Sequence, residues 1–341
     1  MEDLKLTVNP PKTTTMRAVQ QNAYGENAND VFDQVDVPIP DIESDEVLIR
    51  IAASSVNALD WHFMTGTPYF LRLQNGFRTP KRVIPGADVA GTIVKVGSEV
   101  IGFESGDEVF GEIGGGGFAA YAAGTARALA HRPVSLPIEE SAALGVAALT
   151  ALQGLRDWAG IKPGDRVLIN GASGGVGTFA IQIARALGAS HVTAVCSTPN
   201  VETARSLGAD RVVDYTKEDF TEIEDRFDVF FDNAGSKSLS ESKKMLTDDG
   251  VLVVVTGKKG KWFRPLDRII AGAIRSMFWS QRVVNKVAAA SGDDGAILAR
   301  MVEEGKLRVV IDRRFTLDEA IDALAYQATG HAKGKSIIEV S

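Results

Sequence analysis

The hydrophobic pattern of residues 166–196 predicts a strand, a glycine turn, a helix and a second strand. The apolar run Val167–Ile169 leads into a turn at Asn170 and Gly171, and His191–Cys196 is a second run of β-forming residues. Between them, apolar residues recur at helical spacing until Gly188 ends the pattern. They are Val176, Phe179, Ala180, Ile183, Ala184 and Leu187. This order is typical of the first βαβ unit of a nucleotide-binding sheet.

The segments before and after this unit have different patterns. From residue 16 to about 132, short β-forming runs alternate with glycine, proline and acidic turns, which predicts a partly closed antiparallel barrel. The runs are 17–20, 31–37, 46–56, 89–96, 108–110 and 118–122. From 201 to 255, helical and β runs alternate, which predicts a doubly wound parallel sheet.

The ends of the chain complete the domain organisation. An alanine-rich helical stretch at 138–158 marks the passage between domains, and a helix is expected near 295–304. We expect β runs around 318–326 and a final strand, 336–340, that rejoins the barrel. The predicted domains are a tail, 1–15, a catalytic domain, 16–140 with 297–341, and a nucleotide-binding domain, 141–296.

The glycine turn after the first strand of the βαβ unit is the strongest chemical signal. Ala172, Gly174 and Gly177 occupy the three positions of a G-x-G-x-x-G pattern. In that pattern the second glycine lets the backbone approach a pyrophosphate, and the third lets the helix pack closely on the strand. A plain connecting turn is the alternative, but strand, turn and helix occur in the required order. The expected contacts are Ser173, Gly174, Gly175, Val176 and Gly177.

The end of the second strand indicates which dinucleotide binds. An NAD-specific site places a carboxylate about 20 residues after the glycines, whereas residues 195–200 contain none. Ser197, Thr198 and Asn200 could instead donate hydrogen bonds to a 2′-phosphate, so we predict NADPH over NADH. Three further residues follow later strand ends and are candidate cofactor contacts by position: Tyr215, Asn233 and Gly257.

Composition excludes several classes of protein. The net charge is −7, which opposes nucleic-acid binding. The single cysteine, Cys196, excludes an internal disulfide and a multi-cysteine zinc site, and is typical of the reducing cytoplasm. Residues 1–15 lack the pattern of a secretory signal, and no apolar run is long enough to span a membrane. We expect a cytoplasmic homodimer.

Residues 258–282 combine seven Lys or Arg residues with aromatic and aliphatic ones. A basic amphipathic helix of this kind can lie on an acidic membrane surface. Alternatively, its apolar face packs over the substrate cleft or a second subunit while its basic face is solvated. Both interpretations stay open from the sequence.

Five stretches resemble the medium-chain dehydrogenase/reductase superfamily, in its zinc-free quinone oxidoreductase branch, which includes zeta-crystallin-like proteins. They are VNALD at 56–60, PGADVAGTIVKVGSEVIGFESGDEVFG at 85–111, ALGVAALTA at 143–151, NGASGGVG at 170–177 and GHAKGKSIIEV at 330–340. The resemblance implies an α/β chain in which a GroES-like, partly open β-barrel catalytic domain joins a Rossmann domain.

The resemblance also implies roles for individual residues. It places Asn57 and Thr150 near the nicotinamide and Tyr215 beside the 2′-phosphate. His62 stands where some zinc-free relatives have a tyrosine, and could donate a hydrogen bond or proton or simply pack. Zinc-dependent members have Gly-His-Glu where this chain has Gly86, Ala87 and Asp88. Since zinc needs three or four suitable ligands, we expect no zinc.

The predicted activity is hydride transfer from NADPH to a quinone or an α,β-unsaturated carbonyl compound. Without a metal, Asn57, His62 and backbone amides are the candidates to stabilise the developing oxyanion. Two alternatives stay open: an enoyl-thioester reductase, whose basic cluster at 258–282 would meet CoA phosphates, and an NADPH-binding structural or interaction protein without turnover.

Overall fold

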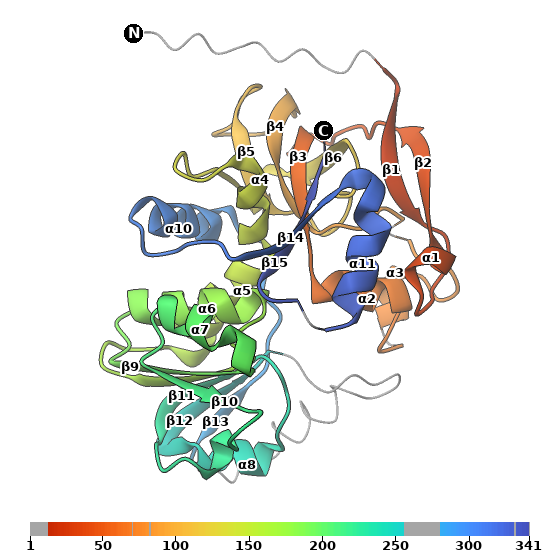
Figure 1. Cartoon of the computed structure of the whole chain (residues 1–341). Coiled ribbons are helices and arrows are strands. Elements are labelled where there is room, and N and C mark those ends of the chain that lie inside the picture. Colours follow the sequence, from red (N-terminus) through yellow and green to blue (C-terminus); the bar gives the residue numbers. More distant parts are fainter. Residues whose placement is uncertain (1–12, 70, 82, 256–279, 331, 341) are drawn as a thin grey trace, which may run out of the picture. The chain divides into compact units, whose positions relative to one another are not determined.

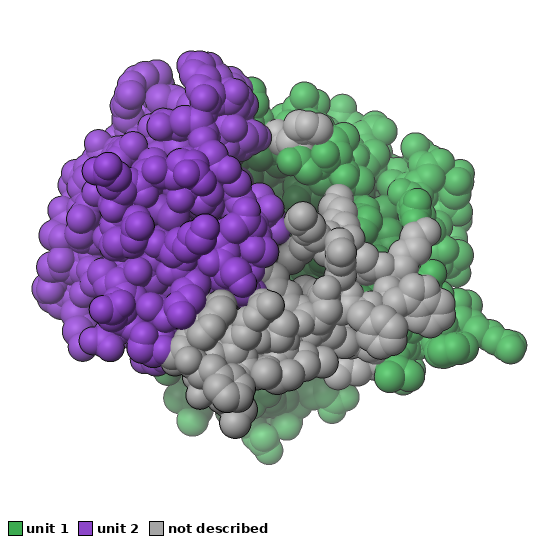
Figure 2. All heavy atoms as spheres, turned by 90° about the horizontal axis from the view of Figure 1, so that it is seen from below, with its two compact units in different colours: residues 1–149, 290–305, 311–341 green, residues 150–289, 306–310 purple. Residues whose placement is uncertain are grey.

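The computed structural model describes residues 13–69, 71–81, 83–255, 280–330 and 332–340. The chain divides into two compact units (Figure 2): unit 1 comprises 1–149, 290–305 and 311–341, and unit 2 comprises 150–289 and 306–310. The chain passes from unit 1 to unit 2 after residue 149 and back to unit 1 after residue 289, whereas the sequence predicts these boundaries after residues 140 and 296. Gly257, most of the basic segment 258–282 and most of the expected tail 1–15 lie outside the described residues.

Unit 1 is built on an extended sheet (Figure 1), in the order β14-β15-β3-β4-β5-β7 with β6 also paired to β3, and β1 and β2 form a separate ribbon. The strands are β1 Thr15–Gln21, β2 Phe32–Pro38, β3 Glu46–Val56, β4 Asp88–Val96, β5 Glu108–Glu112, β6 Tyr121–Thr125, β7 Leu129–His131, β14 Ile311–Thr316 and β15 Lys335–Glu339. The expected return of the last strand to the barrel sheet is therefore confirmed.

Strand β3 is long enough to pair with three strands. One edge pairs with β4, while on the other edge residues 46–50 pair with β6 and residues 53–56 pair with β15, all antiparallel. In this register Ser55 stands opposite Asp88, and Val56 stands opposite Ser336. The end of β3 thus meets the first residues of both β4 and β15.

The helices of unit 1 are short. They are α1 Ala28–Val31, α2 Ala58–Thr65, α3 Leu71–Asn75, α4 Ile138–Ser141, α10 Gly292–Glu303 and α11 Ala320–Ala328, with single 3₁₀ turns at Ala126–Ala128, Ala142–Leu144 and Leu317–Glu319. Helix α10 packs on β7 so closely that a Cβ on Gly292 would lie 2.2 Å from the carbonyl oxygen of Leu129. This packing explains why residues 290–296 belong with unit 1.

The β runs expected around 318–326 are wrong, because α11 occupies most of that stretch. Ala320, Ala323 and Leu324 are buried and spaced as on one helix face, and they join the main core of unit 1. A short apolar run does not by itself separate strand from helix, and alanine and leucine favour the helix. The strand lies earlier, in β14.

Unit 2 is a six-stranded parallel sheet in the order β10-β9-β8-β11-β12-β13. Its strands are β8 Arg166–Asn170, β9 His191–Cys196, β10 Arg211–Asp214, β11 Phe227–Asp232, β12 Leu246–Val254 and β13 Arg282–Val284. Counted along the sheet, this is the 3-2-1-4-5-6 order of a dinucleotide-binding fold, whose ligand lies where the order reverses, between β8 and β11.

Helices cover both faces of this sheet, with α6 and α7 on one side and α8 on the other (Figure 1). They are α6 Gly175–Ala186, α7 Val201–Ser206 and α8 Leu239–Lys244, with 3₁₀ turns at Thr198–Asn200 and Phe220–Glu222. The alanine-rich stretch expected to be helical forms α5 Val146–Gln153, which continues as a π-helix, Gly154–Ala159. The predicted alternation of strands and helices is confirmed.

Candidate active site

The glycine turn of unit 2 joins β8 to α6. Gly171 has a left-handed φ of 81°, and a Cβ on Gly177 would lie 2.2 Å from the Gly171 carbonyl oxygen, so the close packing of helix on turn requires glycine. A Cβ on Gly174 would meet its nearest atom at 3.9 Å. The fold itself therefore does not require glycine at 174, whereas a ligand against the loop would.

A cavity of about 590 Å³ opens at the carboxyl ends of the strands of unit 2. It is lined by the ends of β8 and β9, by residues 215–220 after β10, and by Ala234, Ser236 and Lys237 after β11. Its position at the reversal of strand order is the expected place for a dinucleotide, and the residues of the turn and cavity fit such a group.

The structure brings only some of the predicted cofactor contacts to this cavity. Ser173 and Tyr215 line it, but Ser197, Thr198 and Asn200 do not. Asn200 is buried and donates from Nδ2 to the Ser197 hydroxyl at 3.0 Å. The backbone amide of Asn233 donates to the Asn170 carbonyl at 3.0 Å, and Thr150 is buried on α5.

Two lysines in the cavity wall were missed by the sequence reasoning. Lys217 lies 3.2 Å from Asp214, and Lys237 pairs with Asp219 and lies over the ring of Phe220 at 5.6 Å. Their signal in the sequence was their place shortly after strand ends, the same signal that identified Tyr215. Both cations could meet a ligand phosphate.

The carboxylates beside these lysines are ionised. The Thr198 hydroxyl, which donates to Asp214 at 2.5 Å, and then the Thr216 hydroxyl hold the pKa of Asp214 well below its usual range. Lys237, followed by the Thr221 amide, lowers the pKa of Asp219 to about 2. Thr198 therefore has its hydroxyl hydrogen committed to a neighbouring carboxylate.

The thiol at the end of β9 is not reactive. Burial, and then the negative charge of Asp214, raise the pKa of Cys196 to about 11. Because a thiolate is the effective nucleophile and metal ligand, the raised pKa makes Cys196 a weak nucleophile at neutral pH, and its side chain lines the cavity.

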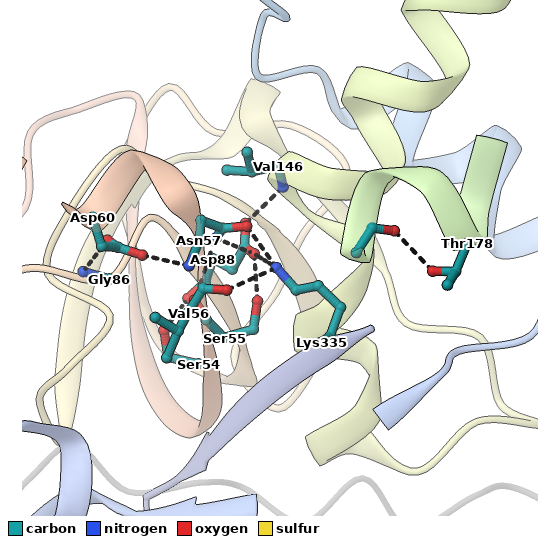
Figure 3. Close-up of polar contacts among 11 residues, drawn as sticks. Ser54, Ser55, Val56, Asn57, Asp60, Gly86, Asp88, Val146, Thr178 and Lys335 are labelled. Atoms are coloured by element: carbon teal, nitrogen blue, oxygen red, sulfur yellow. Dashed lines mark hydrogen bonds and ion pairs between the residues drawn. The ribbon is translucent and has the colours of Figure 1, made fainter. Parts of the chain in front are cut away.

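Unit 1 contains a buried polar network where β3, β4 and β15 meet (Figure 3). The ammonium of Lys335 donates to Asn57 Oδ1 at 2.5 Å and lies 3.3 Å from Asp88 Oδ2 and from the Val56 carbonyl. The side chains of Lys335 and Asp88 are 3% and 0% exposed. A buried ion pair needs such additional hydrogen bonds to offset desolvation.

Asp88 receives donors on both oxygens. Its Oδ2 accepts from the Ser55 hydroxyl at 2.5 Å and from Asn57 Nδ2 at 2.7 Å, and its Oδ1 accepts from the amide of Val146 at 2.7 Å. Asn57 is thus held from both sides, with its oxygen toward Lys335 and its nitrogen toward Asp88. The other contact of Asn57 Nδ2, to the Ser55 carbonyl at 3.3 Å, is the longest of the contacts that the Asn57 side chain makes.

Asp60 completes the support of Asn57. This buried carboxylate accepts hydrogen bonds from the backbone N–H of Asn57 at 2.7 Å and from the backbone N–H of Gly86 at 3.2 Å. Burial, together with the nearby negative charge of Asp88, raises the pKa of Asp60 to about 7 against the opposing effect of these backbone amides. The sequence reasoning missed both Asp60 and Lys335, because neither shows its burial in the local pattern.

Substitution of Asp60 by asparagine should change how stability depends on pH. A carboxyl with a pKa of 3.8 unfolded and about 7 folded stabilises the fold fully below about pH 4, and this contribution is lost as the pH rises through about 7. Relative to Asp60→Asn, the unfolding free energy of the wild type should fall by about 4 kcal/mol across that range. Urea unfolding at several pH values measures it. The exposed Asp36→Asn is the control, and parallel curves for wild type and Asp60→Asn would contradict the expectation.

His62 lies on α2, within unit 1. Its Nδ1 is 2.7 Å from the carbonyl oxygen of Thr67, and its ring meets that of Trp61 edge-on at 5.1 Å. A carbonyl only accepts, so Nδ1 carries the hydrogen. Any proton that His62 gives or takes therefore moves at Nε2.

Zinc does not fit the residues of unit 1 at the position that the resemblance indicated. Across the described ranges, no group of three or more His, Cys, Asp or Glu residues could hold a metal ion. Asp88, the one carboxylate of the Gly86–Asp88 triplet, already has the Lys335 ammonium as its counter-ion.

Comparison with known proteins agrees with this architecture. Residues 43–134 match the family model for the alcohol dehydrogenase GroES-like domain, and residues 207–338 match the model described as zinc-binding dehydrogenase. The chain is 35% identical to the chloroplastic quinone oxidoreductase QR1 of Triphysaria versicolor, covering 95% of this chain and 98% of that protein. It is 36% identical to the 2-methylene-furan-3-one reductase of Solanum lycopersicum, covering 89% of this chain and 74% of that protein.

A solved structure extends the likeness to three dimensions. The quinone oxidoreductase from Coxiella burnetii superposes with a TM-score of 0.83 at 30% identity, covering 96% of this chain and all of that one. A GroES-like unit with a dinucleotide-binding sheet defines a nicotinamide-dependent oxidoreductase. The chain belongs to the medium-chain dehydrogenase/reductase superfamily, in its quinone oxidoreductase branch. None of the described helices is both long and apolar enough to cross a bilayer.

Proposed function

We propose that the protein transfers hydride from NADPH to a quinone or an α,β-unsaturated carbonyl compound, without a metal. The observation that carries the proposal is the glycine turn and its adjoining cavity, whose wall presents Lys217 and Lys237, while no carboxylate ends β9. Relatives support it by name: one is an NADPH-dependent alkenal/one oxidoreductase from Arabidopsis thaliana, 32% identical to this chain.

The residues of each unit have separate tasks in this proposal. The amides of Ser173–Gly177 bind the pyrophosphate at the N-terminus of α6, and Tyr215, Lys217 and Lys237 hold the adenosine end. When bound, the reduced nicotinamide supplies the hydride. In unit 1, the side chain of Asn57 is fixed in orientation. The hydrogen that its Nδ2 donates to the Ser55 carbonyl over 3.3 Å is the one that can most easily be donated to a developing oxyanion instead. His62 can exchange a proton at Nε2.

The proposal includes metal independence, a cytoplasmic location and a homodimeric state. The ion pair of Lys335 with Asp88 supports metal independence, because the carboxylate already has a counter-ion. The presence of a single cysteine in the chain supports a reducing compartment such as the cytoplasm, although the names of several relatives place those proteins in chloroplasts or mitochondria. A homodimer is to be tested by light scattering.

The activity itself is the first test. Purified protein should oxidise NADPH with at least one member of a panel of quinones and enones, and the rate should survive dialysis against EDTA because no step uses a metal. The loss of the near-ultraviolet absorbance of NADPH measures it. Tight NADPH binding with no turnover would indicate a binding protein, and competition by free CoA would indicate a thioester substrate.

Cofactor preference should depend on the two cavity lysines. Lys217→Ala and Lys237→Ala should each reduce the kcat/KM ratio of NADPH to NADH about tenfold, because each removes a charged partner of the 2′-phosphate. Steady-state kinetics with both cofactors measures the ratio. Lys244→Ala, an exposed lysine at the end of α8 that does not line the cavity, is the matched control. An unchanged ratio in both cavity variants would place the phosphate elsewhere.

A further inference from the structure

Exposed apolar side chains are concentrated in one short segment of unit 1. Of the seven large hydrophobic residues exposed in the described parts of the chain, three lie within eleven residues: Leu73 at 75%, Phe77 at 73% and Val83 at 41%. Single exposed apolar residues are ordinary, but a cluster is typical of an interaction site. The segment includes α3 and the loop after it (Figure 1).

The base of this segment is firmly held. The guanidinium of Arg72 lies over the rings of Tyr24 and Tyr69, at 4.3 and 4.7 Å, and donates to the Gly66 carbonyl at 3.0 Å. The Tyr24 hydroxyl donates to the Gly76 carbonyl at 2.7 Å. The anchoring contacts use Arg72 and leave the apolar side chains pointing to solvent, so the exposure belongs to a structured segment.

The charge around the segment is opposite to that of the whole protein. The chain has 44 acidic residues and a net charge of −7, yet residues 61–87 contain no Asp or Glu and four Arg or Lys. Of these, Arg78 and Lys81 are exposed, one and four positions after Phe77 in the chain. Apolar side chains flanked by cations match a lipid surface with acidic headgroups, in which long basic side chains reach the phosphates.

We propose that residues 72–81 and Val83, the apolar-basic loop, bind an anionic lipid surface. Leu73 and Phe77 insert at the level of the headgroups, while Arg78 and Lys81 contact lipid phosphates. A protein partner fits less well, because three side chains fall far short of the roughly 800 Å² that each partner buries in a stable interface. The proposal does not depend on the reductase activity.

Sedimentation of the full-length protein with vesicles tests the proposal. The wild type should bind vesicles of mixed phosphatidylcholine and phosphatidylglycerol and not those of phosphatidylcholine alone, and added salt should weaken binding. Arg78→Gln and Lys81→Gln should each lower the partition coefficient about fivefold. The double variant Leu73→Ser with Phe77→Ser should lower it further and retain the wild-type melting temperature.

Matched controls use other exposed residues of unit 1. Ile101→Ser with Val134→Ser removes two side chains that are 92% and 83% exposed, and Arg50→Gln with Lys95→Gln removes two exposed cations; both should bind as the wild type does. Equal binding to both kinds of vesicle would overturn the proposal, as would binding that every loop variant retains. A third outcome would also overturn the proposal: the wild type self-associates but does not bind vesicles, and the Leu73 and Phe77 variant loses the self-association. The loop would then be a contact between copies of the protein.

Discussion

Replacement of Lys335 by methionine is expected to lower the free energy of unfolding by about 3–5 kcal/mol. The substitution leaves Asp88 as a buried carboxylate without its counter-ion, and it removes the donor that holds Asn57 Oδ1 at 2.5 Å. Chemical denaturation measures the loss of stability. Turnover at saturating substrate should also fall, because the Asn57 amide is then held only through its nitrogen, by Asp88 and the Ser55 carbonyl.

Two variants make this result specific to the ion pair. Lys333→Met changes an exposed lysine two positions earlier and should alter stability by less than about 0.5 kcal/mol. Adding Asp88→Asn to Lys335→Met removes the unpaired charge and should restore part of the lost stability. If Lys335→Met alone were as stable as the wild type, the contact drawn between Lys335 and Asp88 in Figure 3 would not be the buried ion pair described above.

Substitution of either Gly174 or Gly177 by alanine should abolish most cofactor binding, but only one should unfold the protein more easily. At Gly177 the new methyl group would lie 2.2 Å from a backbone oxygen, which should cost about 1–3 kcal/mol and displace the loop, weakening NADPH binding about a hundredfold. At Gly174 the space is open and φ is −80°, so stability should be unchanged while binding weakens about tenfold.

Fluorescence titration with NADPH and thermal unfolding without it separate the two effects. The Gly174→Ala variant serves as the stability control for Gly177→Ala, since both add one methyl group to the same turn. Wild-type affinity in Gly174→Ala would mean that the pyrophosphate does not lie against this turn, and the proposed function would lose its main support.

Local pattern was sufficient to predict much of the fold. The strand-turn-helix sequence around Gly174 predicted β8, α6 and β9, because glycine spacing and helical periodicity act within a few residues. The stretch 318–326 shows where local pattern fails. A short apolar run can form a strand or a helix, depending on what it packs against, and packing against the core of unit 1 favours the helix α11 there.

The buried network could not be predicted in the same way. Asn57 came from a resemblance, whereas Lys335 becomes a partner of Asp88 only through the register of β3 with β4 and with β15. Such register is a property of long-range pairing. The lysines of the cofactor cavity likewise depend on which strand ends are neighbours in the sheet, and not on any motif of their own.

Pairing of β3 with β15 also bears on the order in which the molecule matures. Asp88 and Lys335 are 247 positions apart, and the residues of unit 2 are translated between them. During synthesis, domains fold as units while the chain emerges from its N-terminus, so unit 2 can close before the ribosome has supplied the ammonium that Asp88 requires. Unit 1 can complete its sheet and its buried ion pair only after β15 has been made, on a chain whose unit 2 has already been translated.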